Sequence, residues 1–235
     1  MSFKVVLNPG HCYPPDPGAV GYGLSEAERT QTLVALIAPQ LPSYGIECVI
    51  VHSNELSEIC TLANSSGADL FLSLHINAGG GTGYEDYVFS EGGQADTYRG
   101  LLRIDVMNYL RQYGFSDRGQ KYNSSFYVLK NTSMPAILTE NLFIDTEYDA
   151  ARLGDASFMR GLANAYAKGI ARALGCCLIP PGSAAQTKLA EAVAILQEAG
   201  VISSPEYWLE SAKAGKAVNG EYAGVLIQKM AEKLS

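Results

Sequence analysis

Three apolar runs in this chain each end in a side chain that can bind a metal or move a proton. KVVLNPG is followed by His11, DLFLSLH ends in His75, and PAILTE ends in Glu140. Short apolar runs of this kind are typical of buried β-strands. In open α/β sheets, ligands bind outside the carboxyl ends of parallel strands. We therefore expect two imidazoles and one carboxylate to meet at a single edge of a sheet.

Extended and helical patterns alternate along the first three quarters of the chain. The patterns predict strands at residues 3–7, 47–51, 69–75, 84–90, 126–129 and 136–139, and helices around residues 33–41, 55–64, 95–113 and 149–174. Strands that alternate with helices favour a parallel sheet covered on both faces. The predicted fold class is therefore α/β, a three-layer domain with a mostly parallel central sheet flanked by helices.

The composition changes after the last predicted helix. The stretch IPPGSAA has the character of a linker, and two or three amphipathic helical patterns follow it. We predict a catalytic domain at 1–176, a linker at 177–186 and a small all-α C-terminal domain at 187–235. Tyr207 and Trp208 in that domain either contact a ligand or fill its small core.

The charge and the cysteine content indicate which partners the protein can bind and in which cellular compartment it is made. The net charge is −7 and no basic stripe occurs, so nucleic acid is not an expected partner. Five cysteines without a C-x-x-C motif indicate reduced thiols. The N-terminus enters a strand without a signal peptide pattern, and no run reaches the roughly 18 apolar residues of a membrane span. We expect synthesis in the cytoplasm and no membrane insertion.

The residue types at the sheet edge are those of a catalytic zinc site. Such a site commonly has two imidazoles and a carboxylate, and a further carboxylate acts as general base. Glu140 can supply one acid, and Glu26 or Glu28 in GLSEAER can supply the other. His52 is a rival ligand, and Cys12 as a fourth ligand would close the site. The plainer alternative is that these residues only cap strands and helices in a protein without metal.

Six motifs follow one another in a characteristic order between residues 3 and 175. They are NPGH, DPGAVG, GLSE, ADLFLSLHINA, NSSFYVL and PAILTEN. In this order the chain resembles the zinc-dependent N-acetylmuramoyl-L-alanine amidases of the Amidase_3 family. By position, the resemblance implies that His11, Glu26 and His75 bind one Zn²⁺ and that Glu140 is the catalytic glutamate. Cys12 departs from the family, which usually has Gly there.

The resemblance also implies a substrate. It implies a peptidoglycan hydrolase that uses zinc-activated water to cleave the amide bond between N-acetylmuramic acid and L-alanine. Without an export signal, a phage endolysin that reaches the wall after release fits best, and a bacterial autolysin comes next. Another zinc peptidase or carboxypeptidase, or a non-catalytic wall-binding protein, remains an alternative. The C-terminal helices are a candidate wall-binding module or a site of self-association.

Overall fold

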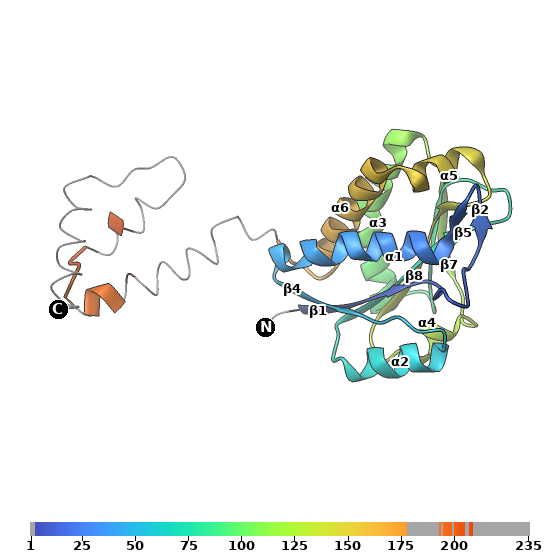
Figure 1. Ribbon diagram of the computed structural model, residues 1–235. Coiled ribbons are helices and arrows are strands. Elements are labelled where there is room, and N and C mark those ends of the chain that lie inside the picture. The colour runs from blue at the N-terminus through green and yellow to red at the C-terminus, as the bar shows by residue number, and fades with distance from the viewer. Residues whose placement is uncertain (1–2, 178–192, 194, 199, 205–206, 209–235) are drawn as a thin grey trace. The chain divides into compact units, whose positions relative to one another are not determined.

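The computed structural model describes residues 3–177, 193, 195–198, 200–204 and 207–208. The chain divides into two compact units, Met1–Leu178 and Ile179–Ser235, and each is described by itself. In the first unit, helices lie on both faces of a six-stranded sheet (Figure 1). This arrangement confirms the predicted three-layer α/β domain.

The sheet is mixed but mostly parallel, with the strand order β4-β1-β5-β8-β6-β7. Its strands are β1 (Phe3–Pro9), β4 (Ile46–Ile50), β5 (Leu70–Asn77), β6 (Tyr84–Val88), β7 (Asp117–Tyr122) and β8 (Ala136–Phe143). The first four in spatial order are parallel, whereas β6 runs antiparallel to β8 and parallel to β7. The carboxyl end of β8 therefore lies beside the beginning of β6. A separate hairpin of β2 (Val20–Gly21) and β3 (Leu24–Ser25) precedes the first helix.

The helices form the two outer layers. They are α1 (Glu26–Ile37), α2 (Leu56–Ser65), α3 (Gln94–Leu110), α4 (Tyr127–Asn131), α5 (Glu147–Gly154) and α6 (Ala156–Ala173), with 3-10 turns at Ala38–Tyr44 and Arg111–Tyr113. Figure 1 shows α1, α3 and α6 on one face of the sheet, and α2 with α4 on the other. Two buried clusters correspond to these two faces.

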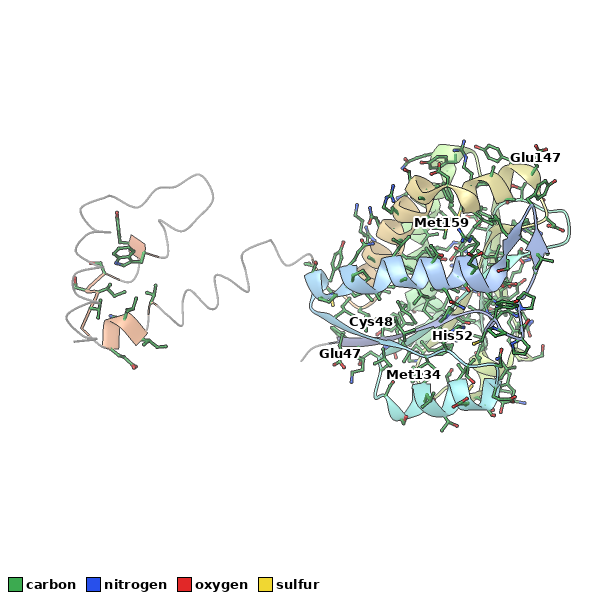
Figure 2. All side chains as sticks on the ribbon, viewed as in Figure 1. Glu47, Cys48, His52, Met134, Glu147 and Met159 are labelled. Atoms are coloured by element: carbon green, nitrogen blue, oxygen red, sulfur yellow. The ribbon has the colours of Figure 1, made fainter. Side chains whose placement is uncertain are left out.

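Alternate residues of the strands fill the two clusters. In β5, Leu72 and Leu74 face the larger cluster, and Phe71 faces the smaller one. Met159 belongs to the larger cluster and Met134 borders the smaller one (Figure 2). Strands buried on both faces must be apolar along most of their length. In β5 and β8 the ionisable side chains, His75 and Glu140, come near the carboxyl ends, where the site lies.

The predicted strand at 126–129 is wrong, because this segment belongs to the short helix α4. The letters FYVL suit a strand, but the periodicity of so short a run does not separate a strand from a buried helical turn. The Asn123 side chain accepts hydrogen bonds from the backbone and hydroxyl of Ser125 and turns the chain just before the helix. Val128 and Leu129 then pack into the smaller cluster.

The predicted single helix at 149–174 is two helices that meet at Asp155. The Asp155 carboxylate accepts hydrogen bonds from the backbone N–H groups of Ser157, at 2.7 Å, and Phe158, at 3.4 Å. These are the contacts of an N-cap, which satisfies N–H groups that have no partner within the helix. The pair Gly154-Asp155 carries the sequence signal for this break, because Gly often ends a helix and Asp often caps the next one.

We expect Asp155→Ala to lower the free energy of unfolding by about 1 kcal/mol, because the start of α6 loses its cap. Urea unfolding followed by circular dichroism measures the change. The matched variant Asp155→Asn keeps a side-chain oxygen that can accept the same bonds, so it should retain most of the stability. Equal losses for Asn and Ala would show that charge, not capping, is what matters at this position.

In the second unit, Val193, Val201 and Ile202 form a small buried cluster. Trp208 packs against this cluster, which is the contact that a core role for Trp208 requires. Most of the predicted segments 177–186 and 187–235 lie outside the described residues. Across the parts of the chain that the structure describes, no helix is both long and apolar enough to span a membrane.

Candidate metal centre

The turn after β1 brings His11 over the end of β5. The backbone N–H of Gly10 donates to the carbonyl of Leu74 at 2.8 Å, and His11 has a φ of 59°. A Cβ atom at Gly10 would lie 2.5 Å from Nδ1 of His75, and one at Gly18 would lie 2.6 Å from Cδ2 of His11. Gly10 of NPGH and Gly18 of DPGAVG are therefore needed because imidazole rings occupy the space beside them.

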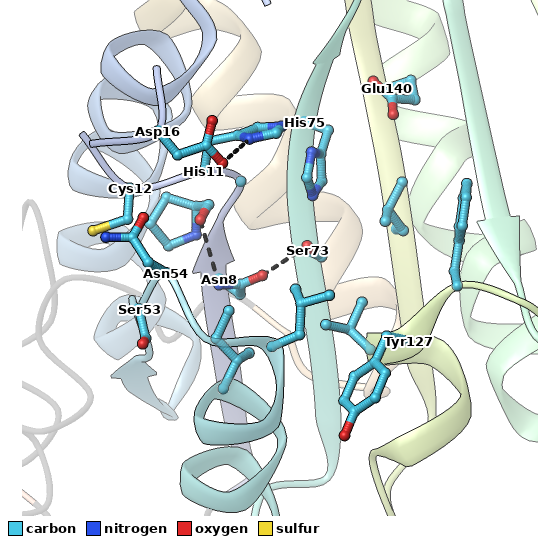
Figure 3. A pocket seen from close by; sticks show the side chains of 17 residues that line it. Asn8, His11, Cys12, Asp16, Ser53, Asn54, Ser73, His75, Tyr127 and Glu140 are labelled. Carbon is cyan, nitrogen blue, oxygen red and sulfur yellow. Dashed lines mark hydrogen bonds and ion pairs between the residues drawn. The ribbon is translucent and has the colours of Figure 1, made fainter. Parts of the chain in front are cut away.

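Three of the residues predicted as ligands meet at this edge. His11, Glu26 and His75 each offer a ligand atom, and these atoms all lie within 4.8 Å of one another. Glu26 Oε2 is 3.2 Å from Nε2 of His11, and Glu26 Oε1 is 3.0 Å from Nδ1 of His75. The two imidazoles lie close together and line one cavity (Figure 3), with ring centroids 5.3 Å apart.

The backbone holds the Glu26 carboxylate in place. Its two oxygens accept hydrogen bonds from the N–H groups of Ala19 and Ile76, each at 3.0 Å. The side chain is buried at the start of α1. Burial alone would raise the pKa of Glu26, but the hydrogen bonds from His11 and His75 outweigh it and hold that pKa well below its usual range.

The charge of Glu26 acts in turn on His11. The hydrogen bond to Glu26 is the main reason that the pKa of His11 rises to about 9, against the opposing effect of burial. Asp16 adds to the rise, since its Oδ2 lies 2.7 Å from Nδ1 of His11. A carboxylate on one ring nitrogen orients the other nitrogen toward a metal. The sequence interpretation assigned no role to Asp16, although it opens the DPGAVG motif.

The structure places the alternative ligands outside the group of three. Glu28 is exposed and pairs with its neighbour Arg29 at 3.3 Å. His52 Nε2 lies 2.7 Å from the backbone carbonyl of His11, and its Nδ1 lies 3.9 Å from the thiol of Cys12. His52 therefore supports the backbone turn that carries His11.

Glu140 lies beside the two imidazoles on the next strand. It pairs in register with His75 across β5 and β8, and it lines the same cavity (Figure 3). Its Oε2 is buried and makes no hydrogen bond to any described residue. Burial, followed by the negative charges of Glu26 and Glu85, raises the pKa of Glu140 to about 8. A carboxyl group that titrates near neutral pH is suited to take up and return a proton.

A cavity of about 430 Å³ adjoins these groups. Asn8 and Ser73 line it, and the Ser73 hydroxyl donates a hydrogen bond of 2.8 Å to the Asn8 side-chain oxygen. Its apolar wall comes from α2, α4 and β8 and consists of Leu56, Ile59, Phe126, Tyr127, Val128 and Leu138. A cavity of this size, mostly apolar with a few convergent polar groups, is typical of a small-molecule or peptide site.

Comparison with known proteins identifies the family to which this sequence is similar. The Amidase_3 family, described as N-acetylmuramoyl-L-alanine amidase, matches residues 5–172. The N-acetylmuramoyl-L-alanine amidase CwlM of Bacillus licheniformis is 41% identical over 177 residues, which cover 72% of this chain and 68% of that protein. The endolysin of Bacillus phage SPP1 is 37% identical over 193 residues, which cover 78% of this chain and 70% of that protein.

A solved structure shares the fold as well. The N-acetylmuramoyl-L-alanine amidase AmiC2 of Nostoc punctiforme superposes with a TM-score of 0.68 at 27% identity, over 74% of this chain and 97% of that one. The family match at residues 5–172 includes the turn after β1, the start of α1 and the ends of β5 and β8. All four residues predicted for the site fall within it. The chain therefore belongs to the Amidase_3 family of N-acetylmuramoyl-L-alanine amidases.

Proposed function

We propose that this chain is a zinc-dependent peptidoglycan hydrolase that cleaves the amide bond between N-acetylmuramic acid and the L-alanine of the stem peptide. One observation carries the proposal: His11, Glu26 and His75 present their ligand atoms within 4.8 Å of one another, and the two histidines line the same cavity as Glu140. Family membership and the names of the relatives support the choice of bond.

The three side chains fit a zinc ion by the chemistry of their donors. Two imidazole nitrogens and one carboxylate oxygen are a common set of protein ligands in catalytic zinc sites, which keep a further position open to water. The buried Glu26 carboxylate faces both imidazoles, so a cation bound by the three side chains would neutralise its charge. An ion held there supplies Lewis acidity, which activates water and polarises a carbonyl.

The side chains of this chain supply the proton transfers and the positioning. We assign Glu140 as the base that accepts a proton from the attacking water and returns it to the leaving amine of L-alanine. Its unpartnered Oε2 is available for that exchange. Asp16 keeps the His11 ring oriented through Nδ1. The products are a stem peptide with a free amino terminus and a glycan that keeps its lactyl group.

The biological setting is part of the proposal. We infer an endolysin that acts on the wall after release from the cytoplasm, because the SPP1 endolysin matches over 78% of this chain. A bacterial autolysin is the second candidate, supported by the Bacillus licheniformis amidase. Both assignments have the same substrate bond and the same chemistry.

Digestion of purified peptidoglycan tests the reaction. We expect new L-alanine amino termini, with lactyl groups retained on the glycan, as detected by amino-terminal labelling and mass spectrometry. A carboxypeptidase would instead release an amino acid from the far end of the stem peptide. A non-catalytic wall-binding protein would sediment with the wall and release nothing. Either result would contradict the proposed function.

A further inference from the structure

A charged cluster lies beside Glu140, and its two cations have no role in the proton transfers proposed above. It consists of Glu85 on β6, with Arg118 and Lys121 on β7. Glu85 pairs in register with Glu140 across β6 and β8, so both side chains project from the same face of the sheet. Since neighbouring strands lie about 4.8 Å apart, β7 is only about 10 Å from the strand that carries Glu140.

Each oxygen of the Glu85 carboxylate accepts two hydrogen bonds. Its Oε2 accepts hydrogen bonds from Arg118 Nε at 2.7 Å and from Lys121 Nζ at 2.6 Å. Its Oε1 accepts from Asn77 Nδ2 at 3.1 Å and from the Tyr87 hydroxyl at 2.7 Å. Two cations therefore share one carboxylate, and the cluster keeps one surplus positive charge.

The surplus charge faces solvent. The Glu85 side chain is 5% exposed, whereas the side chains of Arg118 and Lys121 are 36% and 37% exposed. Arg118 contacts Glu85 only through Nε, and its two terminal nitrogens make no hydrogen bond to any residue that the structure describes. The guanidinium lies over the Phe143 ring, 4.7 Å from its centroid, which holds it in place.

These features are those of an anion site. The two terminal nitrogens of a guanidinium match the two oxygens of a carboxylate and bind it with parallel hydrogen bonds. For a substrate bound at the proposed zinc site, the anion recognised here would belong to a group near the reacting amide. An extended peptide advances about 3.3–3.6 Å per residue, so a group on the second stem residue lies about 7 Å from the scissile nitrogen. Long Arg and Lys side chains cover the remaining distance.

We propose that Arg118 and Lys121 bind a free carboxylate on the second residue of the stem peptide, on the leaving-group side of the scissile amide. A stem peptide with a γ-linked glutamate at that position carries such a carboxylate, and amidation of the glutamate removes its charge. The inference rests on the proposed function and adds a specificity: the chain prefers walls whose second stem residue is not amidated.

Two synthetic muramyl peptides test the inference, one with the free carboxylate at the second residue and one with a carboxamide. We expect wild-type kcat/KM to be about 10- to 100-fold higher for the free acid, the range typical of hydrogen bonds to charged groups. Arg118→Gln and Lys121→Met should each bring the ratio of the two kcat/KM values toward one. Arg118→Lys should restore part of it.

The matched control is Arg172→Gln. Arg172 is an exposed cation on α6 that pairs with Asp105 at 2.8 Å, and it makes no part of the cluster around Glu85. This variant should keep the wild-type ratio. Thermal unfolding of each variant shows whether it is folded, and the two cluster variants give independent readings if one of them is not.

The outcomes separate the carboxylate site from the reaction itself. Equal wild-type rates on the two peptides would overturn the site while leaving the amidase reaction intact. If the Arg118 and Lys121 variants slow both peptides by the same factor, the cluster only supports Glu85 and the site is again overturned. If the wild type cuts neither peptide before L-alanine, the proposed function fails and the carboxylate site fails with it.

Discussion

Glu140→Gln is expected to lower kcat by about 10²- to 10⁴-fold while the chain still binds zinc. The amide has nearly the size of the acid, so the packing between β5 and β6 is kept. It cannot accept a proton from water, however, and the proposed transfer to the leaving amine is lost. Two measurements on the same preparation test this expectation. Hydrolysis of a muramyl peptide measures kcat, and atomic absorption measures the zinc content.

Glu47→Gln is the control for this change. Glu47 is an exposed acid on β4 that pairs with Lys4, and it takes no part in the cavity. Its variant should keep full turnover and full zinc content. If Glu140→Gln were as active as wild type, Glu140 would not be the base. If it lost zinc together with turnover, Glu140 would be a metal ligand instead.

His75→Ala is expected to abolish both zinc binding and turnover. The proposed site has three protein ligands, and removal of one leaves only His11 and Glu26 to hold the ion. Zinc content after dialysis should fall from about one ion per chain to near zero, with hydrolysis at background. A His75→Ala chain that retains one tightly held ion and its activity would refute this ligand set.

Two further variants are expected to have smaller effects on zinc binding than His75→Ala. Asp16→Asn should weaken zinc binding by about 10- to 100-fold rather than abolish it, because Asp16 contacts His11 and not the ion. Glu28→Gln should leave zinc binding as in wild type, since Glu28 is exposed beside Arg29. A competition titration against a chelator resolves these steps. Loss of zinc in Glu28→Gln would contradict the assignment of Glu26.

The strand ends were predictable because the buried strands β5 and β8 are apolar along most of their length. A polar residue at the end of such a run stands out, which is how His75 and Glu140 were found. The choice between Glu26 and Glu28 could not be made from helical periodicity, since both lie in the first turn of α1. It depends on long-range contacts, namely the N–H groups of Ala19 and Ile76 that fix Glu26.

Features without an apolar pattern were missed. Strand β7 has the sequence DRGQKY and only exposed or half-buried side chains, so it carries no hydrophobic signal. It pairs only with β6 at the end of the sheet order, and backbone pairing defines it. Since β7 was not predicted, the convergence of Arg118 and Lys121 on Glu85 was not predictable either. Asp16 was missed because its contact with His11 depends on loop geometry.

Because β6 and β7 run opposite to the other strands, substrate preference can change separately from the residues proposed for catalysis. Two of the proposed metal ligands, His11 and His75, and the proposed base Glu140 lie at or near the carboxyl ends of parallel strands, whereas the proposed carboxylate site lies on two strands that run the other way. Segments 78–83 and 114–116, which lead into these strands, belong to different loops from those that carry His11 and Glu26. We expect insertions or substitutions there to alter which stem peptides are cleaved while the residues proposed for bond breakage stay unchanged.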